Sequence, residues 1–382
     1  MRMAVFISIF VSLQVLVNLY IGVRGWQALE WMASARPYLV VMSVLLTFAY
    51  LFGEILERRA PSILSDILVW MGAYWFAFMA YLLLAIVAID LVRVAQHFFH
   101  FLPSPTPGDY LKFKFFGGVT VLLIVCLVIL RGNYNATHIH VKRLELAIRK
   151  PSEHDSLRVV MMSDMHLGTI ISRNRLQTMI DTVNTLKPDL VLLAGDEIDG
   201  NPGPVMNARL GEFFERIQSN YGVYAITGNH EYIGDADRSV NYLAAHGVKW
   251  LRDTSVVTAG VTIVGREDLS MRRADGEHRK PLDRLMEHVD RTRPVILMDH
   301  QPFHLEEAER EGVDLQLSGH THHAQIWPFN YITQKVYELS WGYKQRGSTH
   351  YYVSCGVGTW GPPVRIGSYS EIVELTLRFS NG

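Results

Sequence analysis

Apolar and polar positions follow different patterns in the two parts of the chain. Up to about residue 134, long apolar runs predict membrane helices. The strongest run, residues 67–89, holds no charged residue over 23 positions, which is enough for a helix to cross roughly 30 Å of hydrocarbon. Weaker runs cover residues 3–23, 38–53 and 111–130. We therefore expect a transmembrane region with four spans over residues 1–134.

The basic residues that flank these runs give a small preference for one orientation. With four spans, both ends of the bundle lie on one side of the membrane. The six basic residues on that side are Arg2, Arg58, Arg59, Arg131, Lys142 and Arg143, and the five opposite are Arg24, Arg36, Arg93, Lys112 and Lys114. The positive-inside rule then favours a cytoplasmic position for the second part of the chain.

From about residue 157 the pattern changes to short apolar runs separated by amphipathic stretches. Runs such as LRVVMM and DLVLLA predict buried strands. Stretches near residues 173–185, 205–218 and 237–246 predict helices. This alternation indicates a layered α/β domain over residues 157–382, with a linker at 135–156.

Composition narrows the choice of partners and cofactors. The chain has 36 Lys and Arg against 37 Asp and Glu, and 27 of the basic and 31 of the acidic residues follow residue 134. A mildly acidic second part gives no support for a nucleic acid polymer as partner. Only Cys126 and Cys355 are present, far apart, so neither a disulfide framework nor a cysteine metal site is expected.

Polar side chains of metal-ligand type follow five of the strand-like runs. They are Asp164 and His166, Asp196, Asn229 and His230, His300, and His320 with His322. Groups just past the carboxyl ends of neighbouring strands converge on one crevice. Carboxylate, imidazole and amide ligands without thiolate suit Mn, Fe, Zn, Co or Ni. Even without His230, the seven remaining candidate ligands exceed the needs of one ion, so we expect two divalent ions that share a carboxylate, as in phosphoryl-transfer centres.

The motifs SDMHLG, GDEID, GNHE, MDHQP and SGHTHHAQ, in that order, resemble those of the calcineurin-like metallophosphoesterases. The resemblance covers roughly residues 157–379 and is strongest to the membrane-associated bacterial subgroup typified by YkuE and YaeI. It implies a β-sandwich flanked by helices, a dinuclear metal site with Mn favoured, and a protein of the bacterial inner (plasma) membrane.

The resemblance also implies roles for single residues. The first ion would take Asp164, His166, Asp196 and His322, and the second Asp196, Asn229, His300 and His320. His230 would contact the phosphate or protonate the leaving oxygen. Four further residues are candidates for supporting or substrate-contacting roles, with a solvated or purely structural role as the alternative: Asp199, Glu231, His323 and Arg365.

An aromatic-rich stretch, residues 327–343, directly follows the histidine cluster. Aromatic side chains favour the membrane interface, so this stretch favours a lipid-linked phosphoester or pyrophosphate as substrate. The alternative for the stretch is a hydrophobic cluster that closes the domain. The alternatives for the whole chain are a phosphodiesterase of soluble nucleotides with a membrane anchor, and a membrane sensor or scaffold without turnover.

Overall fold

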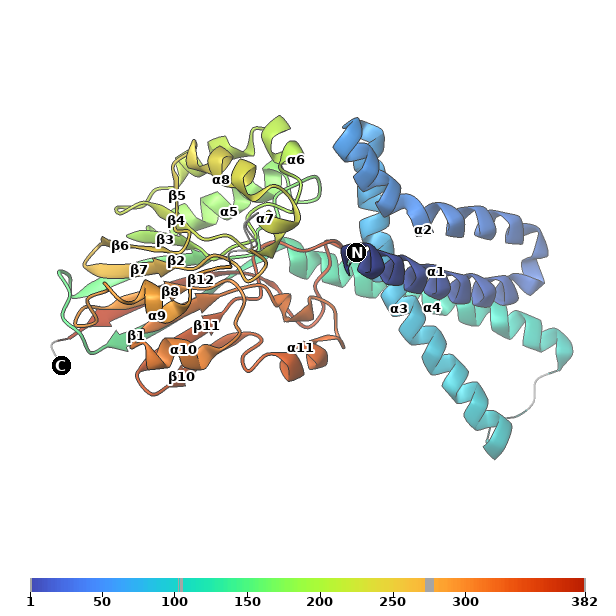
Figure 1. Cartoon of the computed structure of the whole chain (residues 1–382). Coiled ribbons are helices and arrows are strands. Elements are labelled where there is room, and N and C mark those ends of the chain that lie inside the picture. The colour runs from blue at the N-terminus through green and yellow to red at the C-terminus, as the bar shows by residue number, and fades with distance from the viewer. Residues whose placement is uncertain (1, 102, 104–105, 272–277, 381–382) are drawn as a thin grey trace. The chain divides into compact units, whose positions relative to one another are not determined.

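The computed structural model of the chain describes residues 2–101, 103, 106–271 and 278–380. It divides into two compact units, Met1–Gly132 and Asn133–Gly382. Unit 1 is helical, and unit 2 contains two β-sheets with helices around them (Figure 1).

Unit 1 is built from helices that lie along one another. Their bounds are α1 (Arg2–Ala28), the 3-10 helix η1 (Leu29–Ala35), α2 (Arg36–Arg59), α3 (Ile63–Phe99) and α4 (Pro107–Thr137). Among the described residues, three helical segments are long and apolar enough to cross a membrane: Val11–Arg59, Ile63–Phe99 and Gly108–Thr137. The first two expected spans thus lie in a single 49-residue segment that contains most of α1 and all of α2.

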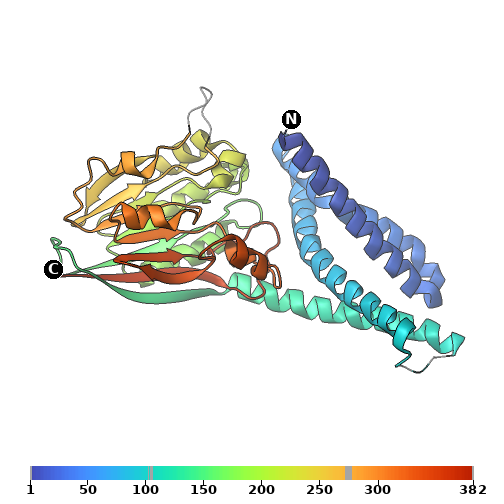
Figure 2. The ribbon, with the colours of Figure 1, turned by 60° about the horizontal axis from the view of Figure 1, so that its bottom comes forward.

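Close packing of α2 against its neighbours depends on small residues. α2 packs against α1 and α3 (Figure 2). A Cβ added at Gly72 of α3 would lie 2.3 Å from the backbone nitrogen of Tyr50, so only glycine permits this approach. Asn18, a polar interruption of the first apolar run, accepts a hydrogen bond of 2.7 Å from Trp75 Nε1, which satisfies a group that lipid could not.

Unit 2 contains two six-stranded sheets. The first has the order β1 (Ile139–Ile148), β12 (Ser370–Phe379), β2 (Ser156–Met162), β3 (Leu190–Leu193), β4 (Val223–Ala225) and β5 (Val248–Trp250). The second has the order β10 (Gly342–Arg346), β11 (Thr349–Val353), β9 (Leu315–Ser318), β8 (Val295–Met298), β7 (Val261–Gly265) and β6 (Thr254–Thr258). Strands β2 to β5 are mutually parallel, as are β7, β8, β9 and β11.

The core of unit 2 lies between the sheets, and helices cover their outer faces. Val159, Leu192, Ile296 and Leu317 belong to one buried cluster that joins both sheets. The helices are α5 (Arg173–Thr185), α6 (Pro202–Asn207), η2 (Leu210–Arg216), α7 (Asn229–Ile233), α8 (Ala236–Ala244), α9 (Leu282–Leu285), α10 (Leu305–Arg310), η3 (His322–Ala324) and α11 (Asn330–Val336). Figure 1 shows α5 and α8 on the side of the first sheet and α9 and α10 on the side of the second.

Two local features of the structure were not anticipated from the sequence pattern. The expected linker contains β1, which pairs in parallel with β12 from Ile139 to Ile148. β1 is an edge strand with many exposed positions, so its sequence lacks the apolar run of the central strands. The helix expected near residues 205–218 is split into α6 and η2, because Arg209 between them adopts a left-handed conformation with φ of 53°.

Candidate metal centre

The carboxyl ends of five strands meet on one side of unit 2. Asp164 and His166 follow β2, Asp196 follows β3, and Asn229 starts α7 just after β4. The second sheet contributes His300 after β8, and His320 and His322 after β9. Both sheets therefore supply side chains, as expected for parallel strands whose carboxyl ends face the same way.

Backbone hydrogen bonds hold these turns against one another. The amide of Asp164 donates to Gly195 O at 2.9 Å, and the amide of His166 donates to Asp196 O at 3.0 Å. The amide of His320 donates to Asp164 Oδ1 at 2.9 Å, which joins a turn of the second sheet to one of the first.

The turns adopt conformations that cost free energy. Left-handed φ angles occur at five of the expected ligands: Asp164, His166, Asp196, His320 and His322. Such a conformation costs roughly 1–2 kcal/mol for a non-glycine residue, and clusters of this kind mark functional sites. Gly228 is required for a different reason, because a Cβ there would lie 2.1 Å from Asp196 Oδ1.

Asp164, His166 and His322 form one group of converging ligand atoms. The Nε2 atoms of His166 and His322 are 2.9 Å apart, and His322 Nε2 lies 3.4 Å from Asp164 Oδ1. Burial, together with the positive charges of His166 and Arg365, lowers the pKa of His322 well below its usual range. His322 therefore presents a neutral nitrogen with a lone pair, the form that binds a metal ion.

Asp196, His300 and His320 form a second group. Asp196 Oδ2 is 3.1 Å from His300 Nε2. His320 Nδ1 is 2.7 Å from Asn229 Oδ1, which brings the expected amide ligand to the same group. Burial lowers the pKa of His320 to about 3, and the charge of His300 acts in the same direction.

Asp196 lies between the two groups. Its Oδ1 accepts the amide hydrogen of His230 at 2.8 Å, whereas Oδ2 faces His166 Nε2 at 3.8 Å and His300 Nε2 at 3.1 Å. Burial opposes ionisation of Asp196, but the charge and hydrogen bond of His300 hold the pKa of its carboxyl well below the usual value. A single carboxylate oxygen thus reaches nitrogen atoms of both groups.

The donor set of both groups fits divalent cations. His300 Nδ1 lies 2.7 Å from Ala194 O, so this nitrogen donates its hydrogen to the carbonyl and Nε2 points at Asp196. A backbone carbonyl in this position is the usual support for a metal-binding imidazole. Asp164 Oδ2 is buried and accepts no hydrogen bond from the described residues. Cations between these atoms would satisfy the carboxylate oxygen and the paired imidazole nitrogens together.

Asp199 contacts two histidines at the edge of the first group. Its Oδ1 lies 3.2 Å from His166 Nδ1 and 2.8 Å from His230 Nδ1. Burial alone would lower the pKa of His230, but the hydrogen bond to Asp199 and the charge of Asp196 raise it to about 9. Asp199 thus contacts the Nδ1 atoms of both imidazoles and raises the pKa of His230.

Glu231 and Arg365 hold the backbone of the site. Glu231 accepts hydrogen bonds from the amides of Asp196, Ile198 and Gly228 at 3.2, 3.0 and 2.7 Å, and contacts no histidine through a described hydrogen bond. Arg365 is fully buried. Its Nη2 donates to the carbonyls of Cys355, Gly356 and Gly358 and lies 3.3 Å from His322 Nδ1. Arg365 therefore positions a loop and His322, and its burial leaves no face for a substrate.

Other candidates lie outside the two groups. His323 packs on Trp341, with ring centroids 5.2 Å apart, and its Nδ1 lies 3.2 Å from Ser340 Oγ. Trp341 also donates to Glu371, so this part of the aromatic stretch is internal packing. Arg266 is buried, and its Nη1 lies 3.0 Å from Asp299 Oδ2.

Sequence reasoning missed two residues beside the site. Glu197 is fully buried and accepts the amide hydrogen of Gly195 at 3.0 Å, which fixes the turn before Asp196. Trp360 is 57% exposed, and its ring lies 6.1 Å from that of His230. Glu197 in GDEID and Trp360 in GTWG can be read from the sequence. However, neither a glutamate nor a tryptophan at a turn indicates by itself a position beside a metal site.

The comparisons with known proteins agree with this geometry. Residues 157–324 match the family described as calcineurin-like phosphoesterase. YkuE of Bacillus subtilis, a metallophosphoesterase by name, is 31% identical over 243 residues, which cover 60% of this chain and 82% of that protein. The chain belongs to the calcineurin-like metallophosphoesterase family. Proteins of this family generally bind two divalent metal ions.

Two further relatives of this metallophosphoesterase differ in the share that is covered. A metallophosphoesterase of Helicobacter pylori is 31% identical over 223 residues, 58% of this chain and 60% of that protein. A Bos taurus protein named as a transmembrane protein with a metallophosphoesterase domain is 32% identical over 248 residues, 60% of this chain and 55% of that protein. The chain thus spans less than two thirds of the length of both relatives. The apolar helices of this chain, together with the name of the bovine relative, support membrane association.

Proposed function

We propose that the chain is a membrane-anchored phosphoesterase with a dinuclear metal centre that hydrolyses a phosphoester or pyrophosphate bond of a lipid-linked substrate. One observation carries this proposal: Asp196 Oδ2 faces His166 of one ligand group and His300 of the other. A carboxylate in this place would hold both cations, which would supply a nucleophilic water at neutral pH and stabilise the charge of the transferred phosphoryl group.

We assign the ligands by group. The first ion would be held by Asp164, His166, Asp196 and His322, and the second by Asp196, Asn229, His300 and His320. Imidazole and carboxylate donors suit manganese among the first-row metals, and availability decides between them.

His230 supplies the proton in this proposal. Asp199 occupies its Nδ1, so Nε2 is the nitrogen that we assign to the leaving oxygen of the substrate. The raised pKa means that the imidazole carries its proton near neutral pH, as a general acid requires. Transfer of the proton from Nε2 to the leaving oxygen avoids the release of an unstable oxyanion.

The lengths of the helices support a proposal for the membrane topology. We propose that α1, α2, α3 and α4 each cross the bilayer, since the shortest, α2, has 24 residues and about 20 suffice. Residues 1–134 then form the transmembrane region and residues 157–382 the catalytic domain, with 135–156 leading into it. We place the chain in a bacterial inner (plasma) membrane, in line with its bacterial relatives, and the basic flanks favour the cytoplasmic side for the catalytic domain.

An exposed apolar surface beside the metal centre supports a lipid-linked substrate. We call it the α11 patch, and it consists of Trp327, Phe329, Tyr331, Ile332 and Val336. Ile332 is 58% exposed and Trp327 47%. Tyr337, which ends this segment, lies with its ring 6.0 Å from that of His320. The apolar surface therefore continues from solvent to a proposed metal ligand, as an acyl or prenyl chain joined to phosphate would need.

The test uses the full chain in detergent micelles with manganese and two substrates, bis-p-nitrophenyl phosphate and a long-chain lipid phosphate. Asp196→Asn should lower kcat/KM on both by at least a hundredfold, because the loss of a ligand exceeds the effect of its supporting partners. Trp327→Ser with Ile332→Ser should lower only the rate on the lipid phosphate, by about tenfold.

Val257→Ser is the matched control, since Val257 is a 63% exposed apolar residue of β6 outside the α11 patch. If Asp196→Asn hydrolyses the small diester like the native chain, the protein is a scaffold rather than an enzyme. Equal losses on both substrates in the α11 patch variant would instead favour a phosphodiesterase of soluble molecules.

A further inference from the structure

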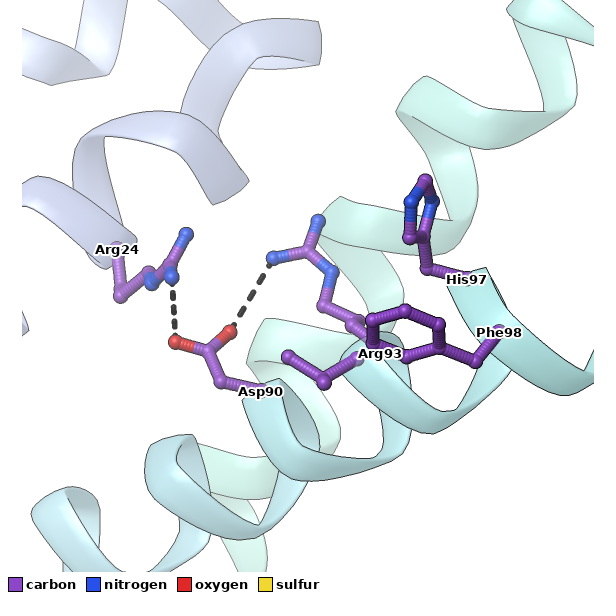
Figure 3. Close-up of a pocket in the computed structure, with 6 residues that line it drawn as sticks. Arg24, Asp90, Arg93, His97 and Phe98 are labelled. Carbon is purple, nitrogen blue, oxygen red and sulfur yellow. Dashed lines mark hydrogen bonds and ion pairs between the residues drawn. The ribbon is translucent and has the colours of Figure 1, made fainter.

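A second cluster of charged residues lies in unit 1. A cavity of about 410 Å³ is lined by Arg24 of α1 and by residues of α3, namely Asp90, Arg93, Val94, His97 and Phe98. Figure 3 shows the guanidinium groups of Arg24 and Arg93 on either side of the Asp90 carboxylate. Two guanidinium groups share this carboxylate, so the three residues leave one positive charge uncompensated among themselves.

The carboxylate of Asp90 does not use all the donors around it. Its Oδ2 accepts from Arg24 and from Tyr20, and its Oδ1 lies 3.5 Å from Arg93 Nη1. Arg93 Nη2 donates to Tyr110 of α4 at 2.9 Å. Arg24 Nε is buried and meets no acceptor among the described residues. The cavity is therefore rich in donors, and a buried donor without an acceptor costs free energy until an acceptor arrives.

The surroundings of the cavity place it at the level of lipid headgroups. The uncharged run of α3 ends at residue 89, directly before Asp90. Arg36 lies 4.8 Å from the centre of the Trp26 ring, and Lys114 lies 4.9 Å from that of Tyr110. Tryptophan, tyrosine and basic residues together mark the interface between hydrocarbon and water.

The lining has the two chemical characters of a phospholipid. Arg24 and Arg93 present guanidinium donors that match phosphate oxygens, and their side chains remain 31% and 42% exposed. Val94 and Phe98, one turn further along α3, are exposed apolar residues beside them. An ion pair that served only to join α1 and α3 would need one arginine rather than two.

We propose that this cavity binds the phosphate of a net anionic phospholipid, with the oxygens on Arg24 and Arg93 and the acyl chains along Val94 and Phe98. None of the residues that line the cavity belongs to the ligand groups of unit 2. We therefore assign this lipid to binding rather than to hydrolysis. The inference stands whether or not the chain turns over a substrate.

The test measures binding of fluorescent phosphatidylglycerol to the full chain in nonionic detergent. Arg93→Gln should weaken binding by about five- to tenfold, since one charge-assisted contact is lost. Asp90→Asn should strengthen it by a similar factor, because it removes the competing carboxylate. Arg36→Gln, which changes a basic residue at the same level but outside the cavity, should leave binding within about twofold.

The competitors identify the source of the phosphate. Unlabelled phosphatidylglycerol should displace the probe. Phosphatidylcholine at the same concentration should not displace it, and neither should about 10 mM inorganic phosphate. Displacement by inorganic phosphate alone would overturn the lipid assignment. Equal affinity of the native chain, Arg93→Gln and Asp90→Asn, with size-exclusion and thermal-unfolding profiles that show all three chains to be folded, would overturn the site itself.

Discussion

In unit 2, the buried aspartates at the amino-end edge of the β-sheets, where the strands begin, have different partners from those at the carboxyl-end edge, where the strands end. At the amino ends of β8 and β9, Asp314 accepts hydrogen bonds from Lys150 Nζ at 2.7 Å and from the amide of Val295 at 2.8 Å. At the carboxyl ends, Asp164 and Asp196 face imidazole nitrogens, and Asp164 Oδ2 meets no donor among the described residues. The first edge pairs its aspartate with a lysine, whereas the second pairs its aspartates with imidazoles and leaves Asp164 Oδ2 without a donor among the described residues.

This difference separates the stability of the fold from its chemistry. Lys150 offsets part of the cost of burying the Asp314 carboxylate, and it does so whatever the metal concentration. Aspartates that surround a metal site contribute only when the metal is bound, and without it they add repulsion and strained turns. The comparison therefore makes predictions that depend on whether metal is present.

The largest effect should follow removal of the metal from the native chain. Chelation should abolish hydrolysis and lower the Tm of the full chain by roughly 10 °C, since binding at a thousand times Kd adds about 4 kcal/mol and each kcal/mol shifts Tm by about 2–4 °C for a unit of this size. Manganese should restore both. Thermal unfolding with and without EDTA, together with the metal content of each sample, checks the prediction.

Substitution of one proposed ligand at a time tests which histidine holds which metal ion. His322→Gln should leave one bound metal ion per chain, as should His320→Gln, because each histidine belongs to a different group. Two ions retained by His322→Gln would show that this imidazole is not a ligand.

The next effect is of intermediate size. Removal of the metal should reverse the sign of the stability change caused by a substitution at the carboxyl-end edge, but not at the amino-end edge. Asp164→Asn should destabilise the metal-loaded chain but stabilise the metal-free chain by about 1 kcal/mol, because it neutralises a buried charge that has no donor at Oδ2. Asp314→Asn should destabilise both states by about 1–3 kcal/mol, because it breaks a charged pair. Urea unfolding with EDTA or manganese measures all four values, and a loss for metal-free Asp164→Asn would remove the proposed contrast.

The sequence predicted which residues converge at the carboxyl-end edge better than it predicted the rest of the molecule, for a physical reason. Asp196 and His300 directly follow apolar runs whose burial in parallel strands determines where the next residues lie. β1 could not be predicted in the same way, because it is an edge strand whose partner β12 lies some 230 residues later. The supporting contacts of Glu231 and Arg365 with backbone groups depend on the folded loops and leave no pattern in the chain.

The smallest predicted effect lies at the amino-end edge and depends on pH. Burial raises the pKa of Asp314 above its usual value, while Lys150 and the amide of Val295 lower it. Lys150→Met should therefore raise this pKa further and leave a buried carboxylate without a counter-charge.

A group whose pKa is raised in the folded chain penalises folding at high pH, and the penalty disappears as pH falls through the folded value. Lys150→Met should thus lower the free energy of unfolding by about 2 kcal/mol at pH 8 and by less at pH 5, with hydrolysis of the small diester unchanged. Urea unfolding at both pH values measures the difference, with Lys187→Met, at another loop of unit 2, as the control. An equal loss at pH 5 and pH 8 would mean that Lys150 acts through packing of its aliphatic chain, and the amino-end edge would then owe its stability to contact area rather than to a paired charge.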